Sequence, residues 1–222
     1  MSFWKAMIAI VAIVIVLGLL LVTGVIPIGS GKLQTQQKNF SDFTTINLNS
    51  GFQAQITQGS SYNVSITADS NVINRVDVTQ TGNVLTIGLQ PGTFFDIGGT
   101  LKASITMPDV REIQASGGAT VDVTDFALSH DLSVGSSGGS TITVSGQANG
   151  LSASCSGGGQ LKLSGLKVST ASIQLSGGSS ALINVSDKLD ANLSGGSSLT
   201  YEGNPTLGTI TNTGLSTITR QP

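Results

Sequence analysis

The sequence has few of the residues on which catalysis, metal binding and nucleic-acid recognition usually depend. Only 10% of its 222 residues are charged and 5% are aromatic, and it contains one histidine and one cysteine. The formal net charge is −2 and the basic residues are scattered, so no Lys/Arg stripe could follow a phosphate backbone. These absences exclude an intrachain disulfide and argue against a nucleic-acid partner.

Catalytic groups are scarce as well. A Ser-His-Asp arrangement would need the single histidine, His130, which stands between two repeats, and no G-x-S-x-G nucleophile elbow is present. An enzyme acting on envelope polysaccharide would need paired acids, and Asp122 and Asp125 are the only close pair in the early repeats. We predict no catalytic residue and no cofactor, and we expect that the protein is not an enzyme.

The chain is organised around a repeat in residues 113–219. A Gly-Gly pair recurs every 18 to 21 residues, and a serine precedes each pair. No helical pattern and no Gly-Lys-Ser/Thr sequence follows any pair, so the glycines are predicted to form tight corners and not a phosphate cradle. The copies are Ser116-Gly117-Gly118, Ser137-Gly138-Gly139, Ser156-Gly157-Gly158, Ser176-Gly177-Gly178 and Ser194-Gly195-Gly196, followed by a degenerate copy at Thr213-Gly214.

Aliphatic residues alternate on both sides of each corner. They recur four residues before and four residues after the first glycine of every pair. A spacing of two predicts short strands in a stack of coils, one coil per repeat, with aliphatic columns pointing inward. The column before the corner contains Ile113, Val134, Ala153, Ile173 and Ala191, and the column after it contains Val121, Ile142, Leu161, Ala181 and Leu199.

Two further features of the repeat bear on its chemistry. Cys155 stands two residues before a glycine pair, where other copies have Ala, Ser or Leu, which is typical of a small buried side chain. The turns carry Ser, Thr or Gln where a calcium-binding roll would carry aspartate, so no metal site is predicted.

Residues 6–28 are almost wholly apolar and uncharged. As a helix they would span roughly 34 Å, enough to cross a bilayer of about 30 Å. We expect residues 1–5 to be a short tail and residues 6–28 to be a single-pass transmembrane helix, retained as a signal anchor. A cleaved signal peptide is the alternative, but the segment is longer than a usual h-region and no A-x-A sequence follows it.

Two regions lie between this segment and the repeats. Residues 29–39 are polar and rich in Gly and Gln, which predicts a flexible spacer. Residues 40–107 contain strand-like alternating runs without Gly-Gly pairs, separated by turn sequences such as Asn49-Ser50-Gly51.

Residues 43–69, 71–89 and 101–123 together resemble the prokaryotic head GIN domain, which is labelled an autotransporter adhesin. The resemblance depends on packing and turn residues, among them Gly51, Met107-Pro108 and the serial Ser-Gly-Gly corners. It covers residues 40–219 and implies an extracytoplasmic, solenoid-like, all-β domain. None of the matching residues belongs to a catalytic motif.

Hydroxyl-bearing side chains form columns beside the corners. A stack in register would place them about 4.8 Å apart, where they could bind a glycan or simply solvate a regular surface. The exposed loop around residues 93–99 adds two aromatic rings. The candidate binding surface therefore comprises Ser116, Ser137, Ser156, Ser176, Ser194, Thr120, Thr141, Ser180, Ser198, Phe94 and Phe95.

The sequence thus predicts an all-β, β-solenoid or β-helix-like repeat domain with an N-terminal transmembrane helix. The expected function is a non-catalytic, membrane-anchored cell-surface module, either an adhesin or a structural envelope protein, with its C-terminal domain outside the membrane. The alternatives are an envelope scaffold or sensor that binds a protein partner, and a polysaccharide-acting enzyme.

Overall fold

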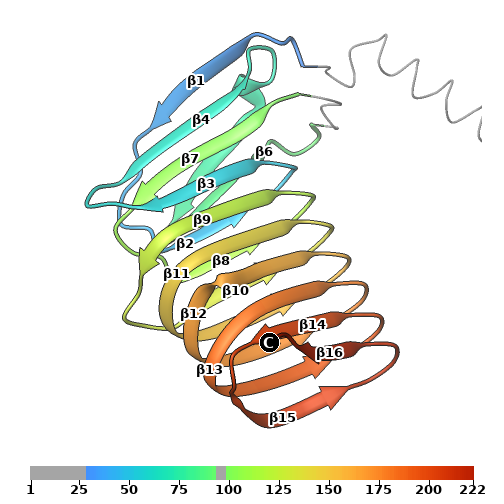
Figure 1. The fold of residues 1–222 in the computed structure, drawn as a ribbon. Coiled ribbons are helices and arrows are strands. Elements are labelled where there is room, and N and C mark those ends of the chain that lie inside the picture. The colour runs from blue at the N-terminus through green and yellow to red at the C-terminus, as the bar shows by residue number, and fades with distance from the viewer. Residues whose placement is uncertain (1–28, 94–98) are drawn as a thin grey trace, which may run out of the picture.

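The computed structural model describes residues 29–93 and 99–222 of the chain. In these residues the protein is all-β, apart from one turn of 3-10 helix, and its strands lie in a stack of coils (Figure 1). The strands form one continuous sheet that is folded into two faces. The predicted β-solenoid-like fold is confirmed.

We name the two faces after one strand of each. In spatial order the β9 face contains β1 (Leu33–Lys38), β4 (Asn63–Asp69), β7 (Leu101–Met107), β3 (Gln53–Gln58), β9 (Thr120–Ala127) and, further along the stack, β14 (Ser198–Glu202) and β16 (Thr217–Arg220). The β10 face contains β5 (Val76–Thr81), β6 (Val84–Leu89), β2 (Thr45–Leu48), β8 (Glu112–Ala115), β10 (Leu132–Ser136) and β15 (Thr206–Asn212).

Three long strands bend from the β9 face into the β10 face and join the two. They are β11 (Thr141–Cys155), β12 (Gln160–Leu175) and β13 (Ser180–Leu193). The 3-10 turn η1 (Ile73–Arg75) lies between β4 and β5. Figure 1 shows the tight corners of successive coils above one another on one side of the stack, and the bends of the long strands on the other.

Parallel pairing places equivalent residues of successive coils beside one another. Ala153 of β11, for example, lies opposite Val134 of β10 and Ile173 of β12. Side chains alternate between the inside and the outside of each strand, so one face of every strand enters the core. Every residue predicted for the two inward columns is at most 4% exposed.

The first strands belong to the same stack. The turn Asn49-Ser50-Gly51 joins β2 to β3 as the later glycine corners join their strands, and Gly117 lies against the backbone of Ser50. β3 pairs with β7 on one side and with β9 on the other, so the chain fills the stack out of sequence order. Residues 40–107 therefore belong to the same stack as the repeats.

The prediction of a flexible spacer at residues 29–39 is wrong. Residues 33–38 form β1, which pairs with β4 along its whole length. The carboxylate of Asp69 accepts hydrogen bonds from the backbone N–H groups of Gly31 (2.6 Å) and Thr100 (2.7 Å). Composition alone predicted a flexible segment. Pairing with β4 instead satisfies the hydrogen-bonding groups of its backbone.

The predicted transmembrane segment, residues 6–28, and the aromatic pair Phe94 and Phe95 lie outside the described residues. In the described part of the chain no helix is both long enough and apolar enough to cross a membrane.

Candidate functional site

The glycine corners form a backbone edge along the stack, which we call the glycine edge. The first glycine of every pair has positive φ, between 59° and 75°, a region that L-residues rarely adopt. A Cβ atom on Gly138 would lie 3.3 Å from the backbone nitrogen of Gly117, and one on Gly177 would lie 3.2 Å from that of Gly157. Glycine is therefore required both for the turn and for the close stacking of corner on corner.

The serine before each glycine pair lies on the β10 side of the glycine edge. Its backbone N–H donates to a carbonyl of the preceding coil, as from Ser137 to Ala115 (2.9 Å) and from Ser176 to Cys155 (2.9 Å). Within the described residues, the side-chain hydroxyls of Ser137, Ser156, Ser176 and Ser194 make no hydrogen bond. These groups are half-buried or exposed, so they are available to a ligand.

A second polar column runs beside the serines, and our interpretation of the sequence missed it. Its members stand three residues before the first glycine of each pair, and the strand register aligns them: Gln114, Gly135, Ser154, Gln174 and Asn192. That fixed offset was the signal that could have revealed the column.

The small residues of this column create a hollow. Gly135 and Ser154 lie between the longer Gln114 and Gln174, and a Cβ on Gly135 would come within 1.9 Å of the Gln114 side-chain oxygen. The Gln114 amide therefore lies over Gly135, where its nitrogen donates to Glu112 (2.9 Å). The resulting cavity of about 280 Å³ is lined by Gln114, Ser136, Ser137, Ser154, Cys155, Ser156, Gln174, Leu175, Ser176, Asn192 and Ser194.

No charged side chain lines this hollow, and its polar groups are hydroxyls and amides. The thiol of Cys155 is only 3% exposed, and burial raises its pKa, which disfavours the nucleophilic thiolate. Cys155 is therefore a small buried side chain, as its position in the repeat indicated. The site presents donors and acceptors of hydrogen bonds without an evident nucleophile.

The other hydroxyl column that the sequence predicted lies on the opposite side of the glycine edge, on the β9 face. Parallel pairing aligns its members there: Thr120, Thr141, Ser180 and Ser198. They do not join the serine column in one hollow. Ser180 and Ser198 instead line a separate groove of about 460 Å³, together with Gln160, Leu161, Lys162, Ser164, Ala181, Leu182, Thr200 and Gln221.

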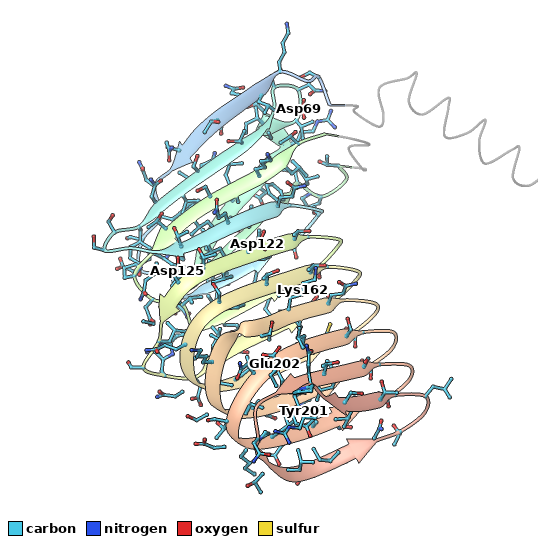
Figure 2. All side chains as sticks on the ribbon, in the orientation of Figure 1. Asp69, Asp122, Asp125, Lys162, Tyr201 and Glu202 are labelled. Atoms are coloured by element: carbon cyan, nitrogen blue, oxygen red, sulfur yellow. The ribbon has the colours of Figure 1, made fainter. Side chains whose placement is uncertain are left out.

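The groups considered for catalysis lie apart from the hollow. Asp122 and Asp125 both belong to β9 (Figure 2), and neither lines the hollow. Asp125 has φ 63°, so the extended strand is interrupted between them. His130 follows β9 and contacts Asp109, at the bend opposite the glycine edge. In the described residues no three His, Cys, Asp or Glu side chains are grouped so that they could hold a metal ion.

Solved structures with the same fold come from bacteria. A putative adhesin from Bacteroides fragilis is 20% identical with a TM-score of 0.70, and the match covers 87% of this chain and 99% of that one. A putative adhesin from Parabacteroides merdae is 20% identical (TM-score 0.51), and a protein described as a putative lipid binding protein from Parabacteroides distasonis is 16% identical (TM-score 0.53); each match covers 87% of this chain and 98% of the other.

The family comparison agrees with the resemblance noted in the sequence. No curated protein matches the chain. The sequence model of the family described as "Putative auto-transporter adhesin, head GIN domain" matches residues 42–205, which include both faces of the stack and five of the glycine pairs. The chain therefore belongs to the head GIN domain family.

Proposed function

We propose that the protein is a non-catalytic, membrane-anchored cell-surface adhesin that binds an uncharged glycan in the hollow beside the glycine edge. The observation that carries this proposal is the row of unpaired serine hydroxyls beside a parallel row of amides. Family membership supports a role at the cell surface. Residues 6–28 would hold the solenoid on the outer side of the membrane.

The chemistry of the hollow suits a polyhydroxylated ligand. Serine hydroxyls and Gln or Asn amides can each both donate and accept hydrogen bonds, as sugar hydroxyls do. Because the hollow has no lining cation, it offers little to phosphate or to a strongly acidic polymer. Repetition at about 4.8 Å lets one extended polymer contact several coils in succession.

The expected affinity for a single chain is low. No aromatic ring lines the hollow, so the apolar stacking that strengthens many binding sites is missing. Binding would depend on many anchored copies that contact one polymer, since multivalent attachment raises avidity by about 10²- to 10⁴-fold. Such weak, repeated contacts are appropriate for adhesion.

A matched pair of substitutions tests the site. Ser154 is exposed on β11 and lines the hollow, whereas Ser152 is exposed on the same side of the same strand and does not. Full-length protein in nanodiscs would be immobilised and tested against an array of neutral bacterial polysaccharides. We expect Ser154→Leu to reduce binding at least about tenfold, because its side chain fills the hollow, and Ser152→Leu to bind like the wild type.

Two results would contradict the glycan proposal. One is that the wild-type protein retains no polysaccharide even at high surface density. The other is that the two substitutions reduce binding equally, which would place the contact outside the hollow.

The location of the domain needs its own test. Protease added to intact cells should remove a C-terminal tag if the solenoid lies outside the membrane. A tag that is protected until the cells are lysed would place the domain inside and would exclude the proposed surface role.

A further inference from the structure

The last coil of the stack exposes apolar side chains that would be buried in any other coil. Leu207 pairs in register with Leu189, and Ile210 pairs with Ala191, both of which are buried. Leu207 is nevertheless 50% exposed and Ile210 36% exposed. Their inner positions are uncovered because no further coil follows in the described structure.

The backbone edges of this coil are free as well. Among the described strands, β15 pairs only with β13 and β16 pairs only with β14. Two strands, one on each face, thus present unpaired N–H and C=O groups at the same end of the stack (Figure 1). Leu215, which stands where earlier corners have their second glycine, is 88% exposed beside them.

Edge strands are usually protected by charged residues, prolines or bulges. β15 carries no charge and no proline, and its one irregularity is an extra residue between Leu207 and Ile210, where the pairing with β13 shifts. The only charged residue in residues 203–222 is Arg220, whose Nε donates to the backbone oxygen of Gly203 (2.8 Å). Lys188 and Asp190 on the neighbouring strand β13 form an ion pair (2.8 Å), so they add no net charge to this end. A like surface would therefore meet little electrostatic repulsion.

The opposite end of the stack is closed. There the antiparallel strand β4 and the turn η1 cover the core, and Val72 and Ile73 are no more than 2% exposed. The outermost strand, β1, has the sequence LQTQQK, in which glutamine and lysine replace the apolar pattern. The open, apolar surface is thus specific to the C-terminal end.

We propose that the C-terminal coil, with the edges of β15 and β16 and the side chains of Leu207, Ile210 and Leu215, docks onto the same coil of a second copy. A single extended peptide could pair with only one of the two edges. Another coil of the same cross-section covers both edges and the apolar surface between them.

Symmetry makes this pairing geometrically possible. The two strands of a coil run in opposite directions on opposite faces. A two-fold axis perpendicular to the stack therefore brings each free edge against an antiparallel partner edge of the other copy. The two apolar cores then become continuous across the junction.

The size of the contact predicts a weak dimer. Seven residues of β15 extend about 23 Å. The two faces lie about 10 Å apart, and their outward side chains widen the end to about 20 Å, so the footprint is on the order of 500 Å² per copy. A total of about 1,000 Å² is below the 1,200–2,000 Å² typical of stable complexes. We expect a monomer–dimer equilibrium with a Kd on the order of 1–100 µM.

The dimer has a consequence that rests on the membrane anchoring proposed above. The two-fold axis places the N-terminal ends of the two copies at opposite ends of the joined stack. Copies anchored in one membrane would present their free ends outward, and the pairing would bridge two membrane surfaces. The protein would then be a homophilic adhesin in addition to a glycan binder.

Sedimentation of the full-length chain in detergent micelles tests the dimer. We expect Leu207→Lys combined with Ile210→Lys to raise the Kd at least tenfold, because the lysines place like charges face to face. Leu33→Lys is the matched control, since Leu33 is 56% exposed but lies at the closed end. Leu215→Lys gives a second variant that cannot disturb the core, and circular dichroism checks that each variant folds.

The outcomes separate clearly. A wild-type chain that stays monomeric up to about 1 mM, roughly tenfold above the expected range, would overturn the proposal. So would a folded Leu207→Lys, Ile210→Lys variant that dimerises normally, or loss of the dimer in Leu33→Lys alone.

Glycan-free vesicles distinguish the two adhesive roles. Phosphatidylcholine vesicles that carry the wild-type chain should cluster, and those that carry the double lysine variant should not. Ser154→Leu should cluster like the wild type, and the double lysine variant should still bind glycan. If clustering fails while glycan binding persists, only the dimer is refuted.

Discussion

The imidazole of His130 donates from Nε2 to a carboxylate oxygen of Asp109 (2.7 Å) and from Nδ1 to the backbone oxygen of Asp131 (2.9 Å). Both partners are acceptors, so only the doubly protonated, charged ring can satisfy both bonds. The Asp131 carbonyl and then the Asp109 carboxylate raise the pKa of His130, against the smaller opposing effects of burial and of Arg111. The contact ties the bend before β8 to the bend before β10.

This pair predicts a pH-dependent stability. The pKa of His130 is higher in the folded state than its ordinary value of 6.5. The pair therefore stabilises the fold fully below pH 6.5, and this stabilisation is lost as the pH rises through the folded pKa. A partly exposed pair of this kind contributes about 0.5 kcal/mol, or about 1–2 °C in Tm.

NMR can follow the ring directly, since His130 is the only histidine. Asp109→Asn should lower the pKa of His130 and flatten the dependence of Tm on pH. An unchanged titration curve in Asp109→Asn would show that the Asp109 contact does not form in solution.

The glycine edge predicts different tolerance at two adjacent positions. Gly177 has φ 71°, and a Cβ there would lie 3.2 Å from the Gly157 backbone, whereas Gly178 has no positive φ and no neighbour within 4 Å. We expect Gly177→Ala to lower the free energy of unfolding by about 1–2 kcal/mol, which corresponds to a Tm decrease of roughly 3–6 °C. Gly178→Ala should leave it nearly unchanged. Thermal unfolding compares them, and equal Tm values would contradict the assigned corner geometry.

The stack could be predicted from the sequence because two local requirements coincide there. Val121, Ile142 and Leu161 recur at one distance after the glycine that turns the chain, and period-two alternation leaves them only an inward direction. The same reasoning identified the serine column, in which Ser116 donates to Asn49 and the other four hydroxyls are free. It could not show that Gln114 folds over Gly135, since the hollow depends on side chains of different coils meeting in three dimensions.

The first strands were harder to place for a different reason. β3 lies between β7 and β9, so the partners of Gln53 are Lys102 and Thr120, 49 and 67 residues away in the chain, and no local pattern links them. Likewise, the Gln-rich sequence of β1 looks disordered until β4 supplies its hydrogen-bonding partner.

The second bend of three coils had a sequence signal that our interpretation did not use. Gly146, Gly165 and Gly203 each stand eight residues after the first glycine of a pair. A Cβ on Gly146 would lie 2.1 Å from the backbone oxygen of Phe126, and one on Gly203 would lie 2.1 Å from that of Val185. At Gly146 and Gly203 the neighbouring backbone therefore leaves no room for a side chain. The same position is Asp125 in β9, with φ 63°, and Val185 in β13, so glycine is not required at every bend.

We predict that Gly146→Ala is more damaging than a change at the glycine edge. It combines a φ of 128° with a backbone clash, so the expected cost is about 3 kcal/mol, or roughly 6–12 °C in Tm. Gly139→Ala is the control, because Gly139 has φ 78° but no atom within 4 Å of a Cβ, which leaves only the conformational cost. If Gly139→Ala destabilised the protein as much as Gly146→Ala, the close approach to Phe126 would not be the cause.

Asp69 predicts how the closed end responds when its hydrogen bonds are removed. The carboxylate is 2% exposed at the first end of the stack and joins Gly31 to Thr100 (Figure 2). In Asp69→Asn the side-chain NH₂ group would face the backbone N–H of either Gly31 or Thr100, two donors without an acceptor between them. We expect this to lower the stability of the closed end by about 2 kcal/mol. Coils in a stack contact only their neighbours, so the loss should stay local.

Hydrogen exchange read by mass spectrometry should therefore show faster exchange in β1 and in the residues around Thr100, with little change in β11 to β13. Asp77→Asn provides the control, because Asp77 is exposed on β5 and makes no such contact. This local loosening matters for function, since Asp69 fixes the solenoid to the segment that follows residues 6–28. Uniformly faster exchange along the whole stack would instead show that the coils unfold as one cooperative unit, and that the closed end governs the stability of the entire domain.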